Sequence, residues 1–225
     1  MGILLLAGAA TALAVHLGWV KVPPNFAPWS DVELEHEPGW FAKLQINGLA
    51  RDVAACRAAL DRSELRYEAL PDRPERNGCG LSGGVSIVRS HIPYSSGFQA
   101  TCALAAGLYW YENLADLAAR RHLGSGLARI DHLGSYACRN IGGGDSGRRS
   151  QHATANALDI AAFRLQDGQI VSVRRDWGKD TAKGRFLQEA HDGACRFFNT
   201  VLGPDYNAAH ADHFHLDLGP ARLCR

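Results

Sequence analysis

The sequence predicts an α+β fold, with a small antiparallel sheet flanked by helices. Segments of helical and of strand-like periodicity follow one another without a β-α-β rhythm, which argues against a parallel sheet. Asp167-Gly168, between two strand-like segments, is a strong signal for a two-residue hairpin turn. With 225 residues, 46% of them hydrophobic and 21% charged, the chain can bury the core of one globular domain.

Apolar periodicity gives the positions of the expected elements. A stripe at helical spacing predicts a helix over 102–121, and two further helices are expected over 52–65 and 181–199. Strands are expected over five short ranges: 84–89, 127–133, 157–165, 169–174 and 213–218.

Residues 1–21 are expected to form an N-terminal membrane anchor or signal segment. Residues 3–20 carry no formal charge, and a bilayer span needs roughly 17 to 25 apolar residues. An uncleaved anchor is favoured over a cleaved signal because the apolar stretch continues to Trp19, past the small residues of a cleavage site. A proline-rich linker over 22–38 would join this anchor to one domain over 39–225.

Six cysteines, an even number without a Cys-x-x-Cys pair, predict three disulfides formed in an oxidising compartment. The domain is therefore expected in the cell envelope, on the periplasmic side of an inner membrane; free thiols in a cytosolic protein are the alternative. Six cysteines allow fifteen connectivities. The expected pairs each tie a helix to a neighbouring loop or strand: Cys56 to Cys79, Cys102 to Cys138 and Cys195 to Cys224.

The charge balance excludes nucleic acid as a partner. The chain has 24 basic and 23 acidic residues, which leaves a net charge of +1. No window of the sequence forms a basic patch, so no electrostatic footprint for nucleic acid is present.

A single carboxylate interrupts an otherwise apolar strand-like run. Asp159 lies within 157–163, and burial of a lone carboxylate is costly unless a cation or a metal ion is its partner. His152 precedes it on a chain that can fold back beside the strand. The alternative is that Asp159 caps or pairs locally and that His152 is an exposed loop residue.

A second stretch alternates polar and apolar residues, as one strand of a sheet does. His213, His215 and Asp217 share one face, and the opposite face is apolar. The alternative is a row of exposed histidines.

Together the two stretches predict a mononuclear Zn²⁺ site. Three imidazole or carboxylate ligands, with a fourth position left to water, are typical of catalytic zinc. A zinc-bound water has its pKa lowered to about 7, so it can attack an amide carbonyl if a base takes its proton and a cation stabilises the oxyanion. The sequence therefore predicts a zinc hydrolase.

The same residues resemble the LAS group of zinc peptidases, which comprises lysostaphin-type enzymes, D-alanyl-D-alanine carboxypeptidases and dipeptidases, and the penicillin-insensitive murein endopeptidase. The hedgehog signalling domain is a structural relative of this group. The motifs that carry the resemblance are Ser150-x-His152, Ala157-x-Asp159-Ile160 and His213-x-His215-Leu216-Asp217. The resemblance implies a LAS/hedgehog-like fold with three zinc ligands: His152, Asp159 and His215.

The resemblance also implies roles for neighbouring residues. The general base would be His213 or Asp212, and the choice stays open because carboxypeptidase members have a Glu at the position of Asp212. His210 completes the His-x-x-His-x-His pattern of the murein endopeptidase. Two further residues would support the ligands: Ser150 and Asp217.

The stretch from Gly134 to Asn140 resembles the Ser-Gly-Tyr-Arg-Ser strand end of the LAS peptidases. The resemblance implies that Arg139 contacts the substrate and stabilises the developing oxyanion. The match is imperfect, since two residues separate Tyr136 from this arginine. The alternative is an arginine paired with a carboxylate such as Asp145.

From about residue 38 to residue 225 the chain is also similar to the bacterial proteins identified as extensin-like, C-terminal domain. Plant extensins are proline-rich wall rods, and only nine prolines occur here, so a fibrous wall protein is excluded. The segments that carry the likeness are Cys56 to Leu60, Cys79-Gly80-Leu81, Tyr136-Ala137-Cys138-Arg139 and Ser150 to Ile160.

Two classes of function follow from these resemblances. The first is a zinc-dependent peptidoglycan hydrolase that cleaves a peptide bond of the stem peptide or cross-link. The alternative is a non-catalytic, zinc-containing module that binds the cell wall or another partner on the same fold. In both cases the expected partners are peptidoglycan and, through the N-terminal segment, the inner membrane.

Overall fold

The computed structural model describes residues 30–225 and, before them, residues 2, 8, 10, 11, 13–15, 17–22 and 27. The expected anchor over 1–21 therefore lies partly outside the described residues. Within the part of the chain that the structure describes, no helix combines the length and the apolar character needed to cross a membrane.

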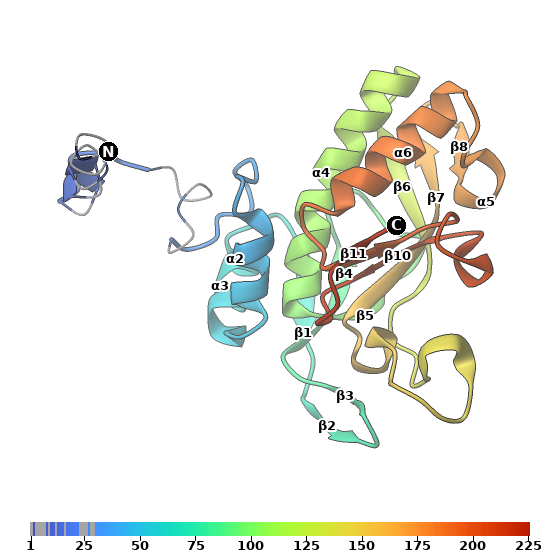
Figure 1. The fold of residues 1–225 in the computed structure, drawn as a ribbon, viewed down its shortest axis with the longest axis horizontal. Helices are drawn as coiled ribbons and strands as arrows, with labels where there is room; N and C mark the ends of the chain where they lie inside the picture. Colours follow the sequence, from blue (N-terminus) through green and yellow to red (C-terminus); the bar gives the residue numbers. More distant parts are fainter. Residues whose placement is uncertain are drawn as a thin grey trace.

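A six-stranded sheet carries the residues of interest (Figure 1). Its strand order is β11-β9-β10-β7-β6, with β8 also paired to β7. All pairs are antiparallel except β11 and β9, which run parallel. The strands are β6 (Leu127–Gly134), β7 (Ala157–Leu165), β8 (Ile170–Ser172), β9 (Thr200–Leu202), β10 (Phe214–Asp217) and β11 (Leu223–Cys224).

Strand β7 is the organising strand of this sheet. Strand β10 pairs with 157–160 and β8 with 162–164, while β6 runs along β7 over nearly its whole length. Five further strands lie outside it, in a three-stranded antiparallel sheet of order β1-β4-β5 and a β2-β3 hairpin. They are β1 (Arg66–Ala69), β2 (Arg73–Arg76), β3 (Cys79–Leu81), β4 (Gly84–Arg89) and β5 (Phe98–Thr101).

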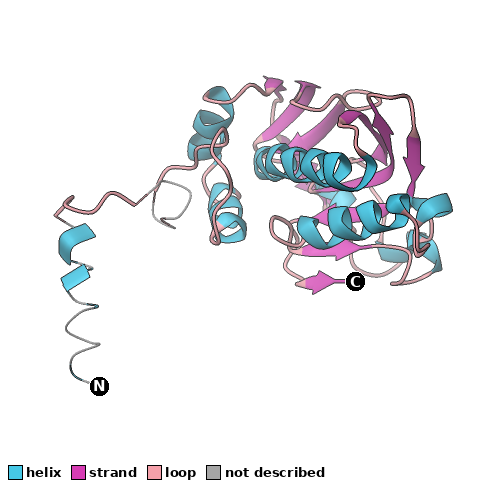
Figure 2. Ribbon diagram, turned by 90° about the horizontal axis from the view of Figure 1, so that it is seen from above, coloured by secondary structure: helices cyan, strands magenta, loops and turns pink. Residues whose placement is uncertain are grey.

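Helix α4 (Cys102–Leu123) is the common partner of the other layers. It begins at Thr101, whose Oγ1 accepts from the Leu104 amide, and ends at Gly124, whose φ of 69° gives the left-handed C-cap that glycine favours. Helix α6 (Ala182–Ala194) lies beside α4 (Figures 1 and 2). Within residues 30–225, the other helices are α2 (Ala42–Leu49), α3 (Val53–Asp61) and α5 (Val173–Asp176), with 3-10 turns η2 (Ile141–Gly143), η3 (Gln151–Thr154) and η4 (Ala208–His210).

The predicted α+β class is confirmed, and the strands over 84–89 and 157–165 have the predicted bounds. The hairpin after β7 is confirmed as well, but its loop is longer than two residues. The Gly168 amide donates to the Leu165 carbonyl, and Gly168 has φ of 87°. This is the three-residue loop in which a left-handed glycine follows a turn.

Several predicted elements are too long. The helix expected over 52–65 ends at Asp61. The strand expected over 169–174 ends at Ser172, where α5 begins and the Asp176 carboxylate accepts from the Ser172 amide at 2.8 Å. The helix expected over 181–199 ends at Ala194, because the chain must turn before it enters β9. The apolar periodicity of a sequence does not indicate where the chain changes direction in this way.

The three disulfides are present, but two of the expected pairings are wrong. Cys195–Cys224 is confirmed. Cys56 instead pairs with Cys102, because α3 packs against α4. Cys79 pairs with Cys138, because β3 lies against η3 and the chain around Cys138 runs beside that turn, where the Ala137 amide donates to the His152 carbonyl.

A fully buried carboxylate joins α4 to the chain that follows β4. Glu112 accepts hydrogen bonds from the Ser90 hydroxyl, the Ile92 amide and the Tyr94 hydroxyl, at 2.7, 3.0 and 2.7 Å. Burial raises the pKa of Glu112 to about 7, although these three hydrogen bonds act in the opposite direction. The folded state therefore holds a proton on Glu112 at pH values where the unfolded chain releases it.

We expect the stability of the protein to fall as the pH rises from about 4.5 to 7 through this residue. A folded-state pKa above the unfolded value means that ionisation favours unfolding, at a cost of up to about 3 kcal/mol above pH 7. Chemical denaturation at pH 5 and pH 8 measures this loss. The Glu112→Gln variant stays neutral and serves as the control: its change between the two pH values should be smaller, and an equal change in both proteins would contradict the assignment.

Candidate metal centre

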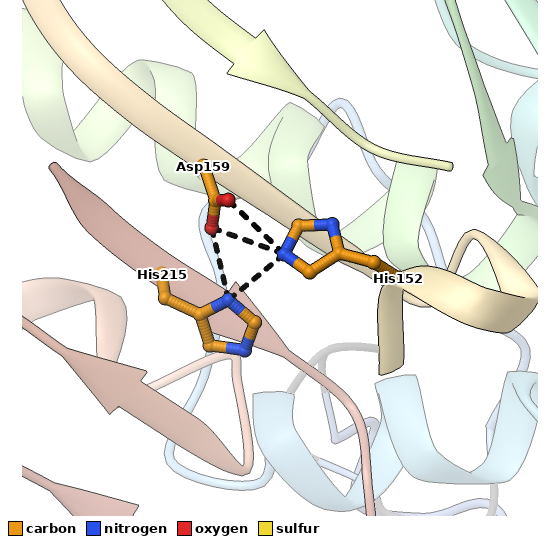
Figure 3. Close-up of side chains that lie close together, drawn as sticks. All are labelled: His152, Asp159 and His215. Carbon is orange, nitrogen blue, oxygen red and sulfur yellow. Dashed lines mark hydrogen bonds and ion pairs between the residues drawn. The ribbon is translucent and has the colours of Figure 1, made fainter. Parts of the chain in front are cut away.

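Three side chains converge at one face of the six-stranded sheet (Figure 3). Asp159 on β7 and His215 on β10 are direct partners in the antiparallel register, so their side chains leave the sheet on the same face. His152 comes from η3, which begins at Ser150, whose hydroxyl accepts from the His152 amide at 3.3 Å. All three ligand candidates are buried, with 2% to 8% of their surface exposed.

The donor and acceptor roles of this cluster follow from its outer contacts. His152 Nδ1 lies 2.6 Å from the Ser135 carbonyl, which can only accept, so Nδ1 carries the proton and Nε2 a lone pair. In the same way, His215 Nε2 donates a hydrogen bond to Asp217 Oδ2 at 2.9 Å, which leaves a lone pair on Nδ1. The inner atoms are therefore His152 Nε2, His215 Nδ1 and the Asp159 carboxylate.

These inner atoms approach one another closely. His152 Nε2 lies 3.1 Å from His215 Nδ1, and these two nitrogens lie 3.2 and 2.9 Å from Asp159 Oδ1. Two imidazole lone pairs and a carboxylate would repel one another at such distances, so positive charge is required between them. A bound cation supplies it directly, and protonation of the imidazoles is the alternative.

The donor set fits zinc. Nitrogen and oxygen ligands about 2.0 to 2.1 Å from a tetrahedral ion lie about 3.3 Å apart, close to the separations seen here. The outer hydrogen bonds to the Ser135 carbonyl and to Asp217 are those that orient metal-binding histidines. His152, Asp159 and His215 could therefore hold a divalent ion and leave a fourth position for a small molecule.

The pKa values of Asp159 and His215 also indicate that the cluster favours positive charge beside the carboxylate. Burial alone would raise the pKa of Asp159, but the adjacent His152 and His215 outweigh burial and hold the pKa well below its usual value. Burial would lower the pKa of His215, but Asp159 and Asp217 outweigh it and raise the pKa to about 9. Without a metal ion, His215 is thus protonated at neutral pH.

His213 borders the cluster without belonging to it. Its Nε2 lies 3.6 Å from Asp159 Oδ1, and its Nδ1 lies 2.8 Å from Asp212 Oδ1. The Asp212 carboxylate, with 49% of its side chain exposed, therefore contacts the outer nitrogen of His213. Of the two residues expected to supply a base, His213 is the one that faces Asp159.

Arg139 and His210 complete the surroundings. Arg139 Nη2 lies 4.0 Å from Asp159 Oδ2, and 45% of the arginine side chain is exposed. The contact expected as an alternative, with Asp145, does not occur among the described residues. The ring of His210 lies 5.2 Å from that of His213 and 5.8 Å from that of His215. Burial, followed by the charges of His215 and His213, lowers the pKa of His210 to about 4.

A second group with metal-binding side chains does not form a comparable site. His191, Asp192 and Cys224 lie close together, but the sulfur of Cys224 is bonded to Cys195. A disulfide sulfur is not a thiolate ligand. Among the described residues, only the cluster around Asp159 offers three free ligand atoms within such distances.

Sequence reasoning missed the role of Ser135. Its backbone carbonyl fixes the orientation of His152, and any residue type can supply a carbonyl. Only the likeness of 134–140 to a known strand end pointed to this segment.

Comparison with protein-family models matches residues 54–225 to the extensin-like protein C-terminus family. The chain belongs to this family. Searches of curated proteins and of solved structures found no significant match. The matched range of the extensin-like domain contains every residue of the cluster, together with Arg139 and His213.

We expect the extensin-like domain to bind one Zn²⁺ per chain, with an affinity that rises as the pH increases. Binding must displace the proton of His215, so below its pKa of about 9 each pH unit should strengthen binding by about tenfold. Competition with a chromogenic chelator at pH 6, 7 and 8 measures this dependence. His215→Ala should abolish binding, whereas His191→Ala, in the second group, should leave it intact. Equal binding by both variants would exclude the cluster as the site.

Proposed function

We propose that this extensin-like domain is a zinc-dependent peptidoglycan hydrolase that cleaves a peptide bond of the stem peptide or cross-link. The convergence of His152, Asp159 and His215 at 2.9 to 3.2 Å carries the proposal, because it creates a buried site that requires positive charge, which a bound metal ion supplies directly. The likeness of these motifs to LAS peptidases supports the choice of reaction and substrate. Zinc held there would polarise the scissile carbonyl and lower the pKa of a coordinated water to about 7.

His213 is suited to act as general base. The Asp212 carboxylate accepts from Nδ1, which leaves the lone pair of Nε2 on the side of Asp159. The carboxylate fixes the orientation of the imidazole ring, as the third group of a nucleophile-base pair does in other hydrolases. In this arrangement Asp212 acts through His213 and does not contact the substrate itself.

Arg139 is suited to bind the substrate carbonyl oxygen. Its guanidinium reaches within 4.0 Å of Asp159 but remains partly exposed, so some of its donors face the open side of the site. A permanent cation at this position stabilises negative charge that develops on a carbonyl during attack.

The proposed location is the cell envelope, with the domain on the periplasmic side of the inner membrane. Three disulfides among six cysteines support an oxidising compartment. Peptidoglycan is accessible in that compartment, so the location agrees with the proposed substrate.

The direct test is incubation of the zinc-loaded full chain with purified peptidoglycan, followed by mass spectrometry of the soluble products. We expect stem-peptide fragments that appear with the native chain and not with His215→Ala. The mass of the fragments identifies the bond. Absence of fragments from a folded, zinc-containing protein that still sediments with peptidoglycan would support the wall-binding module instead.

A second test separates base catalysis from metal binding. We expect His213→Ala to lower kcat by about 100-fold or more while it retains zinc, since general base catalysis contributes roughly 10² to 10⁴ in rate. His91→Ala, at an exposed position away from the cluster, is the matched control and should keep both activity and zinc. Unchanged turnover in His213→Ala would exclude this residue as the base.

A further inference from the structure

A second feature of the molecule lies beside the metal centre. A hollow of about 470 Å³ opens at the end of β6, and β5 and the start of β2 contribute to its walls. It also contains Ser135, whose carbonyl orients His152. Ser135 therefore both lines the hollow and contacts a residue of the candidate metal centre. Its principal polar and aromatic lining residues are Arg73, Ser96, Phe98, Gln99, His132 and Tyr136.

Arg73 supplies the charge of this hollow. Its guanidinium lies 4.4 Å from the centre of the Tyr136 ring, and Nη2 donates to Gln99 Oε1 at 2.7 Å. Among the residues that the structure describes, no carboxylate forms an ion pair with Arg73, and no acidic residue lines the hollow. A guanidinium has five N–H donors, so a positioned cation with unused donors remains at the wall.

Covalent and packing constraints hold this cation close to the metal centre. The Cys79–Cys138 disulfide joins the β2-β3 hairpin, which carries Arg73, to the segment that carries Tyr136 and Arg139. On the opposite wall, the chain after β4 is fixed by Glu112 and by the Ser95 amide, which donates to the Ile130 carbonyl of β6. The hollow is thus a built part of the domain.

We propose that the hollow is a substrate subsite in which Arg73 binds a free carboxylate of the peptide. The proposal rests on the proposed function, because it adds a specificity-determining residue to the same site. A stacked guanidinium presents a planar fork that matches a carboxylate with two parallel hydrogen bonds. The hydroxyl of Ser96 lines the same hollow and no acidic residue of the described chain does, so an anionic group is favoured over a cationic one.

The test measures binding separately from turnover. A fluorescent stem peptide is titrated into the full chain in the presence of a chelator, so that no hydrolysis occurs. Three peptides are compared: one with free carboxylates, one amidated at the C-terminus and one amidated at its side-chain carboxylate. We expect one amidation, and not the other, to weaken binding by about 10- to 100-fold, as loss of a hydrogen-bonded charge pair does. The affected peptide identifies which carboxylate Arg73 binds.

Variants assign the effect to Arg73. The Arg73→Gln variant should bind the peptide with free carboxylates as weakly as the native chain binds the sensitive amidated peptide. The variant should therefore bind these two peptides equally. Arg73→Lys should recover only part of the affinity. Arg76→Gln, an exposed arginine on the same hairpin that does not line the hollow, should bind like the native chain. Equal thermal unfolding of these variants checks that each one folds.

The outcomes separate this inference from the proposed function. Suppose that the native chain discriminates between the peptides, that Arg73→Gln abolishes this discrimination, and that the zinc-loaded chain cleaves none of the peptides. This result would support the subsite and overturn the hydrolase. Cleavage without such discrimination would overturn the subsite and leave the hydrolase. Failure of the native chain to bind any of the peptides would also overturn the subsite.

Discussion

The carboxylate of Asp159 is the constraint on which the arrangement of the site depends. It lies in the central strand of the sheet, and its buried negative charge must be balanced. Four basic side chains have a nitrogen within 4.0 Å of its oxygens: His152, His215, His213 and Arg139. The surrounding elements therefore bring these groups to one point, around a single buried carboxylate.

The segment between β6 and η3 links this carboxylate to the rest of the molecule. Ser135 orients a histidine of the cluster, Tyr136 stacks on Arg73, Cys138 closes a disulfide to β3, and Arg139 reaches Asp159. Side chains and carbonyls of this one short segment thus serve both the cluster and the hollow. Its conformation is fixed at Cys138 covalently and at Ala137 by a hydrogen bond to His152.

The sequence was sufficient for features that a local pattern encodes. Alternation placed His215 and Asp217 on one strand face, although β10 begins at Phe214 and leaves His213 just before the strand. A lone Asp159 in an apolar run indicated a buried partner. The pairing of Cys56 with Cys102 and of Cys79 with Cys138 was not predictable, because it depends on which helices and strands pack together. Short strands such as β9 and β11 were missed, since two or three residues carry too little periodicity. Arg73 had no motif to mark it.

Strand β10 lies between β9 and β7, and it brings His215 into the cluster. The other two members of the cluster precede it in the chain by more than 50 residues. During synthesis, His152 and Asp159 are therefore added to the chain more than 50 residues before His215. A nascent chain cannot assemble the cluster until β10 has been made and has docked between its neighbours. The order of these residues along the chain thus makes assembly of the cluster depend on the synthesis of β10.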